Sequence, residues 1–373
     1  MPHSDDLQFI GIIGTQNGSE SLRAGGDPGT IDKSYVSAIA RAHEYAGFDR
    51  ALIGYFSSAP DGFQIAAYAA HQTQRLNILL AHRPGFVAPT LAARQLASLD
   101  QLSDGRLAVH IITGGSDEEQ ARDGDFLSKD ERYQRTDEYL DILKKTWTST
   151  GPFDHEGEHY RIKGSYAAVK PLQKPHIPIY FGGASEAAIR VAGKHADVYA
   201  LWGESLAQVK ETIAAVRAAA AEHGREQHIR FSLSLRPVLG RTEDEAWARA
   251  ATILERAKAL RAQGPASPVV RQSGLLSQAV GAQRLLQTAS QGRVVDKRLW
   301  TEIATLNGGS GNSTGLVGTP EQVAEALLEY WDVGVSTFLI RGFDPLSDAI
   351  EYGRDLIPLV RAEISSRARL AAE

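Results

Sequence analysis

The chain has 373 residues, 43% hydrophobic and 23% charged, with a formal net charge of -5 and no cysteine. This composition is ordinary for a globular protein. The acidic balance argues against a nucleic-acid-binding protein, and the missing cysteine excludes disulfides and thiolate metal sites. No apolar run reaches the ~20 residues of a membrane span, and the polar start MPHSDDLQ is unlike a secretory signal. We therefore expect a cytoplasmic protein that binds neither nucleic acid nor membranes.

Apolar runs typical of β-strands alternate with helical patterns along the chain. The strand-like runs lie at 7–13, 50–55, 76–82, 106–113, 178–182, 196–202, 230–239 and 336–342. The helical patterns lie at 34–47, 62–73, 89–103, 130–149, 185–194, 205–223, 243–262, 319–333 and 346–368. The alternation also fits a doubly wound sheet, but the count of eight strands favours a (β/α)₈ TIM barrel. Its active site should lie where the strands end and the following loops begin.

Two segments exceed ordinary loop lengths, so residues 1–373 are interpreted as one barrel domain with two insertions. The first, about 114–177, contains a helix and the hairpin-like FDHEGEHYRI. The second, about 264–316, is rich in Gln, Ser, Gly and Arg and ends in NGGSGNSTG. Glycine-dense segments at a barrel rim are suited to closing over a site, so this insertion is interpreted as a mobile lid. A partly disordered insertion is the alternative.

The stretch PIYFGGASEAAIR (178–190) joins a strand, two glycines and an alanine-rich helix. The first N–H groups of a helix lack intrahelical partners and the helix dipole is positive there, so such a junction favours an anion, usually a phosphate. Glycine allows close backbone approach. An ordinary connection with Ser185 as the helix N-cap is the other interpretation.

Three arginines stand at predicted strand ends. In FSLSLRP, Phe231, Leu233 and Leu235 alternate with Ser232, Ser234 and Arg236, which predicts that the polar set points into the barrel. Arg341 ends the last strand, and Arg83 follows the third. Together they would ring one cavity and favour an anionic ligand, although a neighbouring carboxylate is an equally good partner for Arg236.

Two further strand ends carry candidate site residues. Trp202 suits either the core or stacking against a ligand, and the Thr113 hydroxyl is placed to bond the edge of a heteroaromatic ring. His110 is interpreted as an interior histidine with its partners in the fold. We find no dinucleotide fingerprint, P-loop, H-E-x-x-H, G-x-S-x-G or metal-ligand spacing, so no metal is predicted.

Several blocks, in this order, closely match one family. They are PTLAARQLASLDQLSDGRLAVHIITGGS (89–116), DERYQRTDEYLDIL (130–143), PIYFGGAS (178–185), ADVYALWGE (196–204) and LVGTPEQVAEALLEYWDVGVSTFLIRGF (316–343). With them the chain resembles, over about 8–362, the bacterial-luciferase-like flavin monooxygenases. Within that superfamily it is most similar to the two-component, reduced-flavin-dependent alkanesulfonate monooxygenases.

The resemblance implies a TIM barrel, often dimeric or tetrameric, that uses O₂ and reduced FMN from a separate NAD(P)H-dependent reductase. Such enzymes cleave the C–S bond of a sulfonate and release sulfite and an aldehyde. By resemblance, Trp202 lines the substrate pocket and the insertion 264–316 closes over it. Thr113 contacts the isoalloxazine ring, and the FMN phosphate is held by Tyr133, Gly182, Gly183, Ala184 and Ser185.

The substrate positions depart from the group's pattern, while the flavin motifs are kept. Local alignment puts Ser234 and Arg236 where the group has arginine and histidine, and Gln16, Ala59, Asn307 and Phe343 where it has histidine, cysteine, arginine and tyrosine. We expect the same flavin chemistry on a different anionic substrate, either an alkanesulfonate or a polyhydroxylated sulfonate such as sulfoquinovose. The catalytic candidates are Arg236, Trp202 and Arg341, and the substrate-binding candidates are Gln16, Ser234, Asn307, Phe343, Tyr55 and Arg83.

Three alternatives stay open. The first is an FMN- or F420-dependent oxidoreductase of the same superfamily that uses no O₂, although the sequence shows no basic groove for the acidic tail of F420. The second is a flavin-binding relative without turnover, and the third is a TIM-barrel enzyme acting on a phosphate ester.

Overall fold

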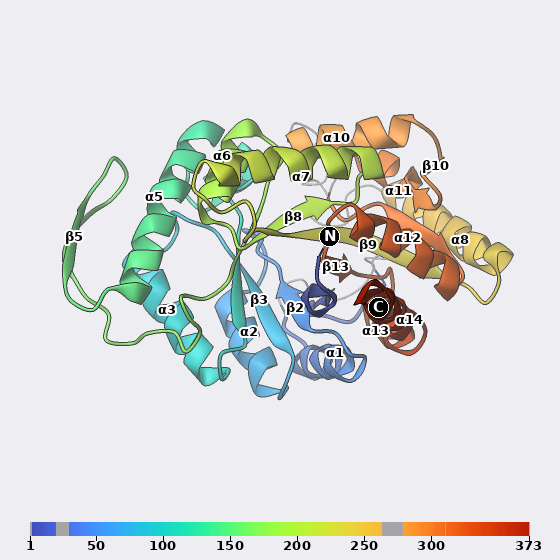
Figure 1. Cartoon of the computed structure of the whole chain (residues 1–373), viewed down its shortest axis with the longest axis horizontal. Coiled ribbons are helices and arrows are strands. Elements are labelled where there is room, and N and C mark those ends of the chain that lie inside the picture. The colour runs from blue at the N-terminus through green and yellow to red at the C-terminus, as the bar shows by residue number, and fades with distance from the viewer. Residues whose placement is uncertain (1, 20–29, 263–278, 310, 373) are drawn as a thin grey trace.

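The computed structural model describes residues 2–19, 30–262, 279–309 and 311–372, and its centre is a closed parallel barrel (Figure 1). Its strands are β1 (Gln8–Ile12), β2 (Arg50–Ile53), β3 (Asn77–His82), β4 (Leu107–Ile111), β7 (Ile179–Gly182), β8 (Val198–Trp202), β9 (Arg230–Leu239) and β13 (Thr337–Ile340). Each pairs in parallel with the next, and β13 pairs with β1 to close the barrel. The eight predicted strands and the predicted (β/α)₈ fold are confirmed.

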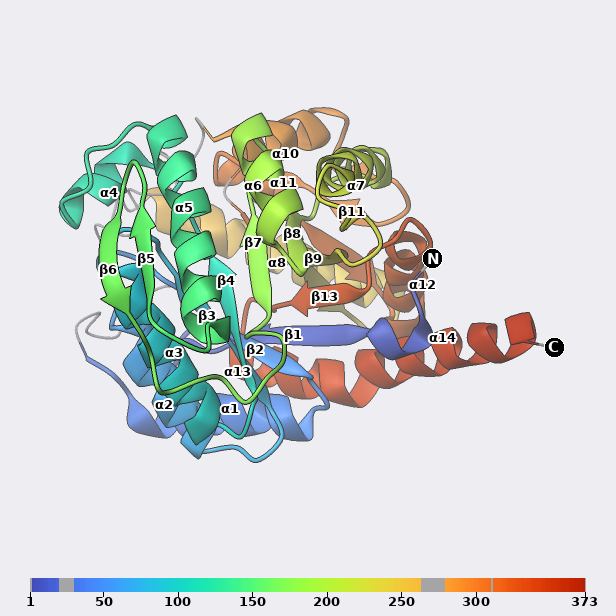
Figure 2. The same cartoon turned by 60° about the vertical axis from the view of Figure 1, so that its left-hand side comes forward.

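Helices follow the barrel strands and cover the outside of the barrel (Figures 1 and 2). They are α1 (Lys33–Tyr45), α2 (Gly62–His71), α3 (Pro89–Leu102), α5 (Lys129–Thr148), α6 (Glu186–His195), α7 (Leu206–Ala221), α8 (Glu243–Ala262), α12 (Pro320–Asp332), α13 (Pro345–Glu351) and α14 (Ile357–Ala372). A 3₁₀ turn (Ser4–Asp6) precedes β1, and a π-helical turn (Tyr352–Leu356) joins α13 to α14. Among the described residues, no helix is both long and apolar enough to cross a bilayer.

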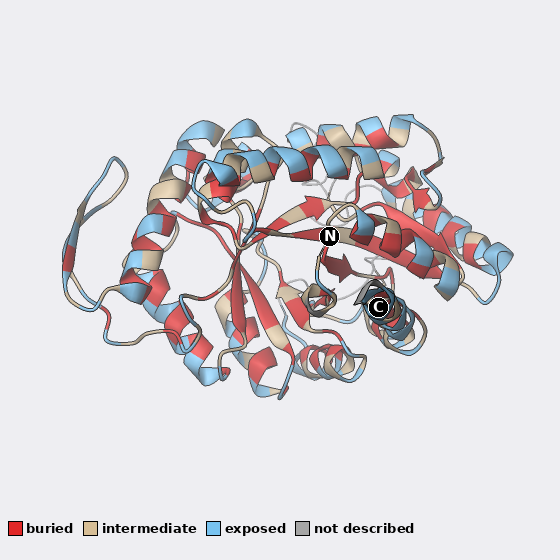
Figure 3. Ribbon diagram, viewed as in Figure 1, coloured by how far each residue is buried: buried red, intermediate tan, exposed pale blue. Residues whose placement is uncertain are grey.

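The core has two layers, one outside and one inside the barrel. Phe231, Leu233 and Leu235 belong to the large outer layer between strands and helices, as their alternation predicts. The inner layer is a small apolar plug made by Ile10, Leu79, Ala108, Tyr180, Val198 and Leu339. Parallel strands buried on both faces read as continuous apolar runs, and Figure 3 shows the barrel strands mostly buried. Any cavity inside the barrel must lie above this plug.

The first insertion carries α4 (Asp117–Arg122) and a two-stranded hairpin, β5 (Phe153–Glu156) with β6 (Arg161–Ser165). The hairpin-like pattern is therefore confirmed. The Glu138 carboxylate of α5 accepts hydrogen bonds from the backbone N–H groups of His159 and Tyr160 and contacts the His155 ring. Figure 2 shows the hairpin beside α5, on the outside of the barrel.

The described part of the second insertion is a folded extension of the barrel. It comprises α10 (Val280–Ser290), β10 (Val294–Val295), β11 (Leu299–Trp300), α11 (Glu302–Leu306) and β12 (Gly315–Gly318). β9 is long enough to pair first with β13, up to Leu235, and then with β12 from Arg236 onward. Residues 264–278 of the predicted lid lie outside the described residues, and the lid remains a prediction.

Candidate active site

A cavity of about 380 Å³ opens at the carboxyl ends of the barrel strands. Its lining comes from β2, β3, β4, β7 and β8, from the segment around α4, and from Ala279–Gly281 at the start of α10. This is the end of a TIM barrel at which active sites are built. The volume falls in the range of pockets that hold small molecules and cofactors.

The turn Gly182–Ser185 forms one wall of the cavity. β7 ends at Gly182, and Ser185 caps α6 by accepting a hydrogen bond from the Ala188 N–H at 3.3 Å. The N–H groups of the first helical turn lack carbonyl partners within the helix, so the site favours an anion there. Both sequence interpretations of this stretch are therefore compatible, because Ser185 is an N-cap beside the cavity.

Two tyrosines fix this turn. Tyr199 of β8 donates its hydroxyl hydrogen bond to the Gly183 carbonyl, and Tyr133 of α5 packs beside Gly183 and Ser185 and lines the same cavity. Gly183 has φ +145°, and an added Cβ would lie 2.8 Å from the Ala188 Cβ and 2.9 Å from the Tyr133 hydroxyl oxygen. Burial raises the pKa of Tyr133, so its hydroxyl stays protonated and able to donate.

Tyr55, Arg83, Thr113 and Glu119 form another part of the cavity wall. Arg83 is 4% exposed, its Nη2 lies 2.7 Å from the Glu119 carboxylate, and its guanidinium stacks 4.5 Å from the Tyr55 ring centroid. Burial, then the charge of Asp123, raises the pKa of Tyr55 to about 12. The positive charge predicted for Arg83 is thus present but paired with an acidic side chain that sequence reasoning did not single out.

Trp202 joins the barrel to the second insertion. Its indole lines the cavity, and a Cβ on Gly281 or on Gly311 would lie 2.9 Å or 2.6 Å from the indole carbons. Glycine is therefore required on both neighbours for this packing. The next charged group, Glu204, is 4% exposed and pairs with Arg284 of α10 at 2.9 Å. Trp202 and this ion pair hold α10 as a wall of the cavity.

The remaining predicted site residues do not line this cavity. Arg236 donates to the backbone carbonyls of Asn312 (2.6 Å) and Gly342 (2.9 Å), and its guanidinium lies 4.6 Å from the Phe343 ring centroid. Phe343 belongs to the apolar cluster around Trp300. Alternation predicted that Arg236 points into the barrel, but β9 has left β13 for β12 at that residue. These partners of Arg236 are main-chain oxygens, and whether it also faces a substrate stays a prediction.

The other predicted site residues that do not line the cavity are Ser234, Arg341, Gln16 and Asn307. Ser234 accepts a hydrogen bond from the Asn312 side chain, and Arg341, whose pKa burial lowers to about 10, follows β13. Gln16 donates to the Thr30 carbonyl at 2.6 Å, and Asn307 is the C-cap of α11. The structure therefore separates the three predicted arginines, since Arg83 alone lines the described cavity.

A family model described as luciferase-like monooxygenase matches residues 7–337. The chain belongs to this family. The assignment confirms the superfamily that the sequence resembles, while the sulfonate-specific group stays a prediction.

Solved structures similar to this luciferase-like monooxygenase agree in fold. Riboflavin lyase RcaE, determined with modified FMN and riboflavin, is 20% identical with a TM-score of 0.78, over 96% of this chain and 92% of that chain. EDTA monooxygenase EmoA from Chelativorans sp. BNC1 is 20% identical with a TM-score of 0.75, and the match covers 96% of this chain and 94% of that chain. The coenzyme F420-dependent tetrahydromethanopterin reductase from Methanopyrus kandleri is 16% identical with a TM-score of 0.66, over 95% and 99%.

The lining of the cavity fits a phosphorylated flavin, the cofactor type that this family implies. The turn at Gly183 leaves no Cβ in the way of a phosphate and directs helix N–H groups at it. Thr113 is 5% exposed, with a hydroxyl at the cavity wall. Lys129, which sequence reasoning missed, adds a cation to the lining. The sequence signal that could have identified Lys129 is its position at the start of α5, one helical turn before Tyr133.

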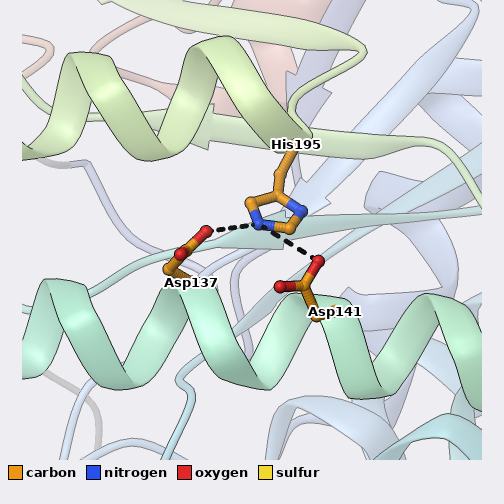
Figure 4. Close-up of side chains that lie close together, drawn as sticks. All are labelled: Asp137, Asp141 and His195. Carbon is orange, nitrogen blue, oxygen red and sulfur yellow. Dashed lines mark hydrogen bonds and ion pairs between the residues drawn. The ribbon is translucent and has the colours of Figure 1, made fainter. Parts of the chain in front are cut away.

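A separate polar cluster of this luciferase-like monooxygenase lies between α5 and α6. Asp137 and Asp141 of α5 face His195 of α6 (Figure 4), with the His195 Nε2 2.6 Å from Asp137. The Lys194 ammonium lies 3.0 Å from Asp137 and 2.8 Å from Asp141. The Lys194 ammonium therefore offsets part of the negative charge of the two carboxylates, and the cluster acts as a tie between helices.

Proposed function

We propose that this chain is a reduced-FMN-dependent monooxygenase of the two-component type that cleaves the C–S bond of an organosulfonate with O₂. The products are sulfite and an aldehyde or equivalent carbonyl compound, and a separate NAD(P)H-dependent reductase supplies the flavin. The observation that carries the proposal is the meeting of Tyr133, Thr113 and the Gly182–Ser185 turn in one cavity beside Trp202. These are the positions that the sequence resemblance assigns to the flavin and the substrate pocket.

The reaction balances with the flavin as the source of two electrons. When bound, reduced FMN would supply them to O₂, so that one oxygen atom enters the carbonyl product and the other leaves as water. The C–S bond breaks and the sulfur leaves as sulfite. The residues of the chain would bind and orient the reactants in a cavity that has the start of α10 as one wall.

FMN is favoured over F420 by the charges around the phosphate turn. The groove on the outer side of this turn, between α5 and α6, has a lining of mixed charge: Asp130, Asp137, Glu186 and Glu222 with Arg190, Lys194 and His223. A long acidic tail, as in F420, would meet carboxylates in this groove. FMN ends in a single phosphate, for which the helix N-terminus and the Tyr133 hydroxyl are sufficient partners.

The substrate assignment rests on the groups at the barrel mouth. We assign Tyr55, Arg83 and Trp202 to the substrate in the cavity. The other candidates rest on the sequence resemblance, since they do not line the described cavity: Gln16, Ser234, Asn307, Arg236, Arg341 and Phe343. The Arg83–Glu119 pair has no net charge, so the sulfonate needs a further cation. Lys129 is the lining cation without an ion-pair partner among the described residues.

The test is anaerobic titration with FMN and riboflavin, followed by oxygenation with a panel of sulfonates and detection of sulfite. We expect FMN to bind more tightly than riboflavin. The Tyr133→Phe variant should lower the affinity for FMN by about tenfold and leave the affinity for riboflavin unchanged, since one hydrogen bond to a charged group is lost. Sulfite should appear with an alkanesulfonate or sulfoquinovose. Flavin binding without sulfite from any sulfonate would contradict the substrate, and equal binding of FMN and riboflavin would contradict the phosphate site.

A further inference from the structure

His110 lies at the floor of the cavity, one layer above the apolar plug of the barrel. It follows Ala108 by two residues on β4, so both side chains point inward. Its neighbours in the adjacent strands are Ala81 of β3 and Tyr180 of β7. Tyr180 precedes Gly182 by two residues, which puts His110 about 7 Å deeper along the strands than the phosphate turn.

The surroundings of His110 on the floor are apolar and small. Leu52, Ala81 and Ala200 line the cavity with it, and Ile112 lies above it on the same face of β4. Small residues at this level leave the space that forms the bottom of the cavity. The imidazole is therefore the polar group that a ligand meets at the buried end.

Neither ring nitrogen of His110 has a hydrogen-bond partner among the described residues, and Nδ1 is fully buried. The sequence interpretation of a satisfied interior histidine is wrong for this reason. His82, one strand away, shows the ordinary arrangement, because its Nε2 lies 2.7 Å from the Tyr139 hydroxyl. Buried polar atoms without partners are rare, and each one is costly unless a ligand satisfies it.

Three other ionisable groups of the cavity already have partners in the protein. Glu119 pairs with Arg83, Glu204 pairs with Arg284, and the Tyr199 hydroxyl donates to the Gly183 carbonyl. Burial lowers the pKa of His110 to about 4. The ring is thus neutral at physiological pH, with one nitrogen that donates and one that accepts.

We propose that His110 is a flavin-binding residue whose neutral imidazole hydrogen-bonds the polar edge of the isoalloxazine ring at the floor of the cavity. This inference rests on the proposed function. The flavin ring edge presents alternating carbonyl and N–H groups, which match a side chain that donates and accepts at once. An N–H donated to this edge stabilises the electron-rich reduced ring more than the oxidised one, so His110 favours the form of the cofactor that the reaction consumes.

The test compares His110→Leu with His110→Asn in binding of oxidised FMN, by quenching of flavin fluorescence, and of reduced FMN, by anaerobic titration. His110→Leu should weaken oxidised FMN about tenfold and reduced FMN by a larger factor, since a buried hydrogen bond is lost. His110→Asn keeps a donor and an acceptor and should restore most of the affinity. His110→Phe, which keeps a flat ring, replaces the leucine variant if that variant does not fold.

His82→Leu is the matched control, because His82 is a buried histidine of the neighbouring strand that does not line the cavity. It should lower thermal stability without changing either FMN affinity. Unchanged FMN affinities in His110→Leu, or an equal loss of affinity for oxidised and reduced FMN, would overturn the inference about His110. The proposed function would still stand if the wild-type protein binds FMN and releases sulfite. Wild-type protein that binds FMN but releases no sulfite fails the proposed function alone, and wild-type protein that binds no FMN overturns both.

Discussion

Both the backbone conformation and the space around it require glycine at position 183. Its φ of +145° is available to glycine but costs any other residue conformational energy, and a Cβ would press against Ala188 and the Tyr133 hydroxyl oxygen. The chain keeps a glycine here because the turn must approach Tyr133 closely, and the absence of a side chain also clears the space for a phosphate. A single position thus serves both the fold and the site.

We predict that Gly183→Ala lowers the free energy of unfolding by about 2 kcal/mol and weakens FMN binding at least tenfold. The reason is that either Tyr133 or the turn must move. Urea unfolding and FMN titration measure the two effects. Gly224→Ala is the control, since Gly224 has φ +64° with open space around it, and it should lose about 1 kcal/mol of stability without loss of FMN affinity. FMN affinity of wild-type strength in Gly183→Ala would rule out the turn as the phosphate site.

At the scale of secondary-structure elements, the helices α5 and α6 together position the turn Gly182–Ser185. One face of α5 carries Tyr133 beside the turn, and Asp137 and Asp141 follow on the same face, where they meet Lys194 and His195 near the end of α6 (Figure 4). Contacts at both ends of α6 therefore fix its direction relative to α5. Burial opposes the charge on Asp137, but the hydrogen bonds from His195 and Lys194 prevail and lower its pKa to about 2.

We predict that Asp137→Asn lowers the free energy of unfolding at pH 7 by about 1 kcal/mol, a figure reduced for the partial exposure of the carboxylate. A depressed pKa stabilises the fold above the unfolded value of 3.8, so the difference from wild type should be constant down to about pH 4 and shrink below it. Urea unfolding across this range measures it. Glu186→Gln, which breaks the exposed pair with Arg190, should change nothing measurable. Wild-type stability of Asp137→Asn at pH 7 would show that the α5–α6 tie adds no stability.

At the scale of the whole molecule, the barrel could be predicted from the sequence because each parallel strand is buried on both faces and therefore forms an apolar run in the sequence. β10 and β11 have two residues each and leave no such pattern. The turn Gly182–Ser185 was also predictable, since the strand, the glycines and the N-cap are adjacent in the sequence; its role in binding a phosphate stays a prediction. These features depend on local structure alone.

The other side of the site depends on contacts between distant segments. Arg236 follows the alternation of β9 perfectly, but the strand changes partner from β13 to β12 at that residue, which no local pattern reports. Arg83 was found at a strand end, whereas its pairing with Glu119 requires α4 to fold back over the cavity. His110 was visible as a residue of β4, but its lack of partners appears only when the neighbouring strands are in place.

The buried histidines together determine how the whole fold responds to acid. Burial lowers the pKa of His43, His82 and His110 to about 4, and burial, against the bond to Asp137, also lowers that of His195. The unfolded chain binds protons at these side chains near pH 6.5, while the folded chain binds them only near pH 4. The free energy of unfolding should therefore fall as pH decreases from about 6.5 to about 4, by about 1.4 kcal/mol per pH unit for each of the three.

Urea unfolding of the flavin-free protein between pH 5 and 7 measures this slope, and His82→Gln tests its origin. The glutamine keeps a hydrogen-bonding group beside Tyr139 but cannot titrate, so the slope should drop by about one third while stability at pH 7 changes little. His228→Gln is the control, since His228 is exposed in the loop before β9 and should leave the slope intact. A slope that is the same in wild type and His82→Gln would mean that His82 binds its proton equally in the folded and unfolded chains.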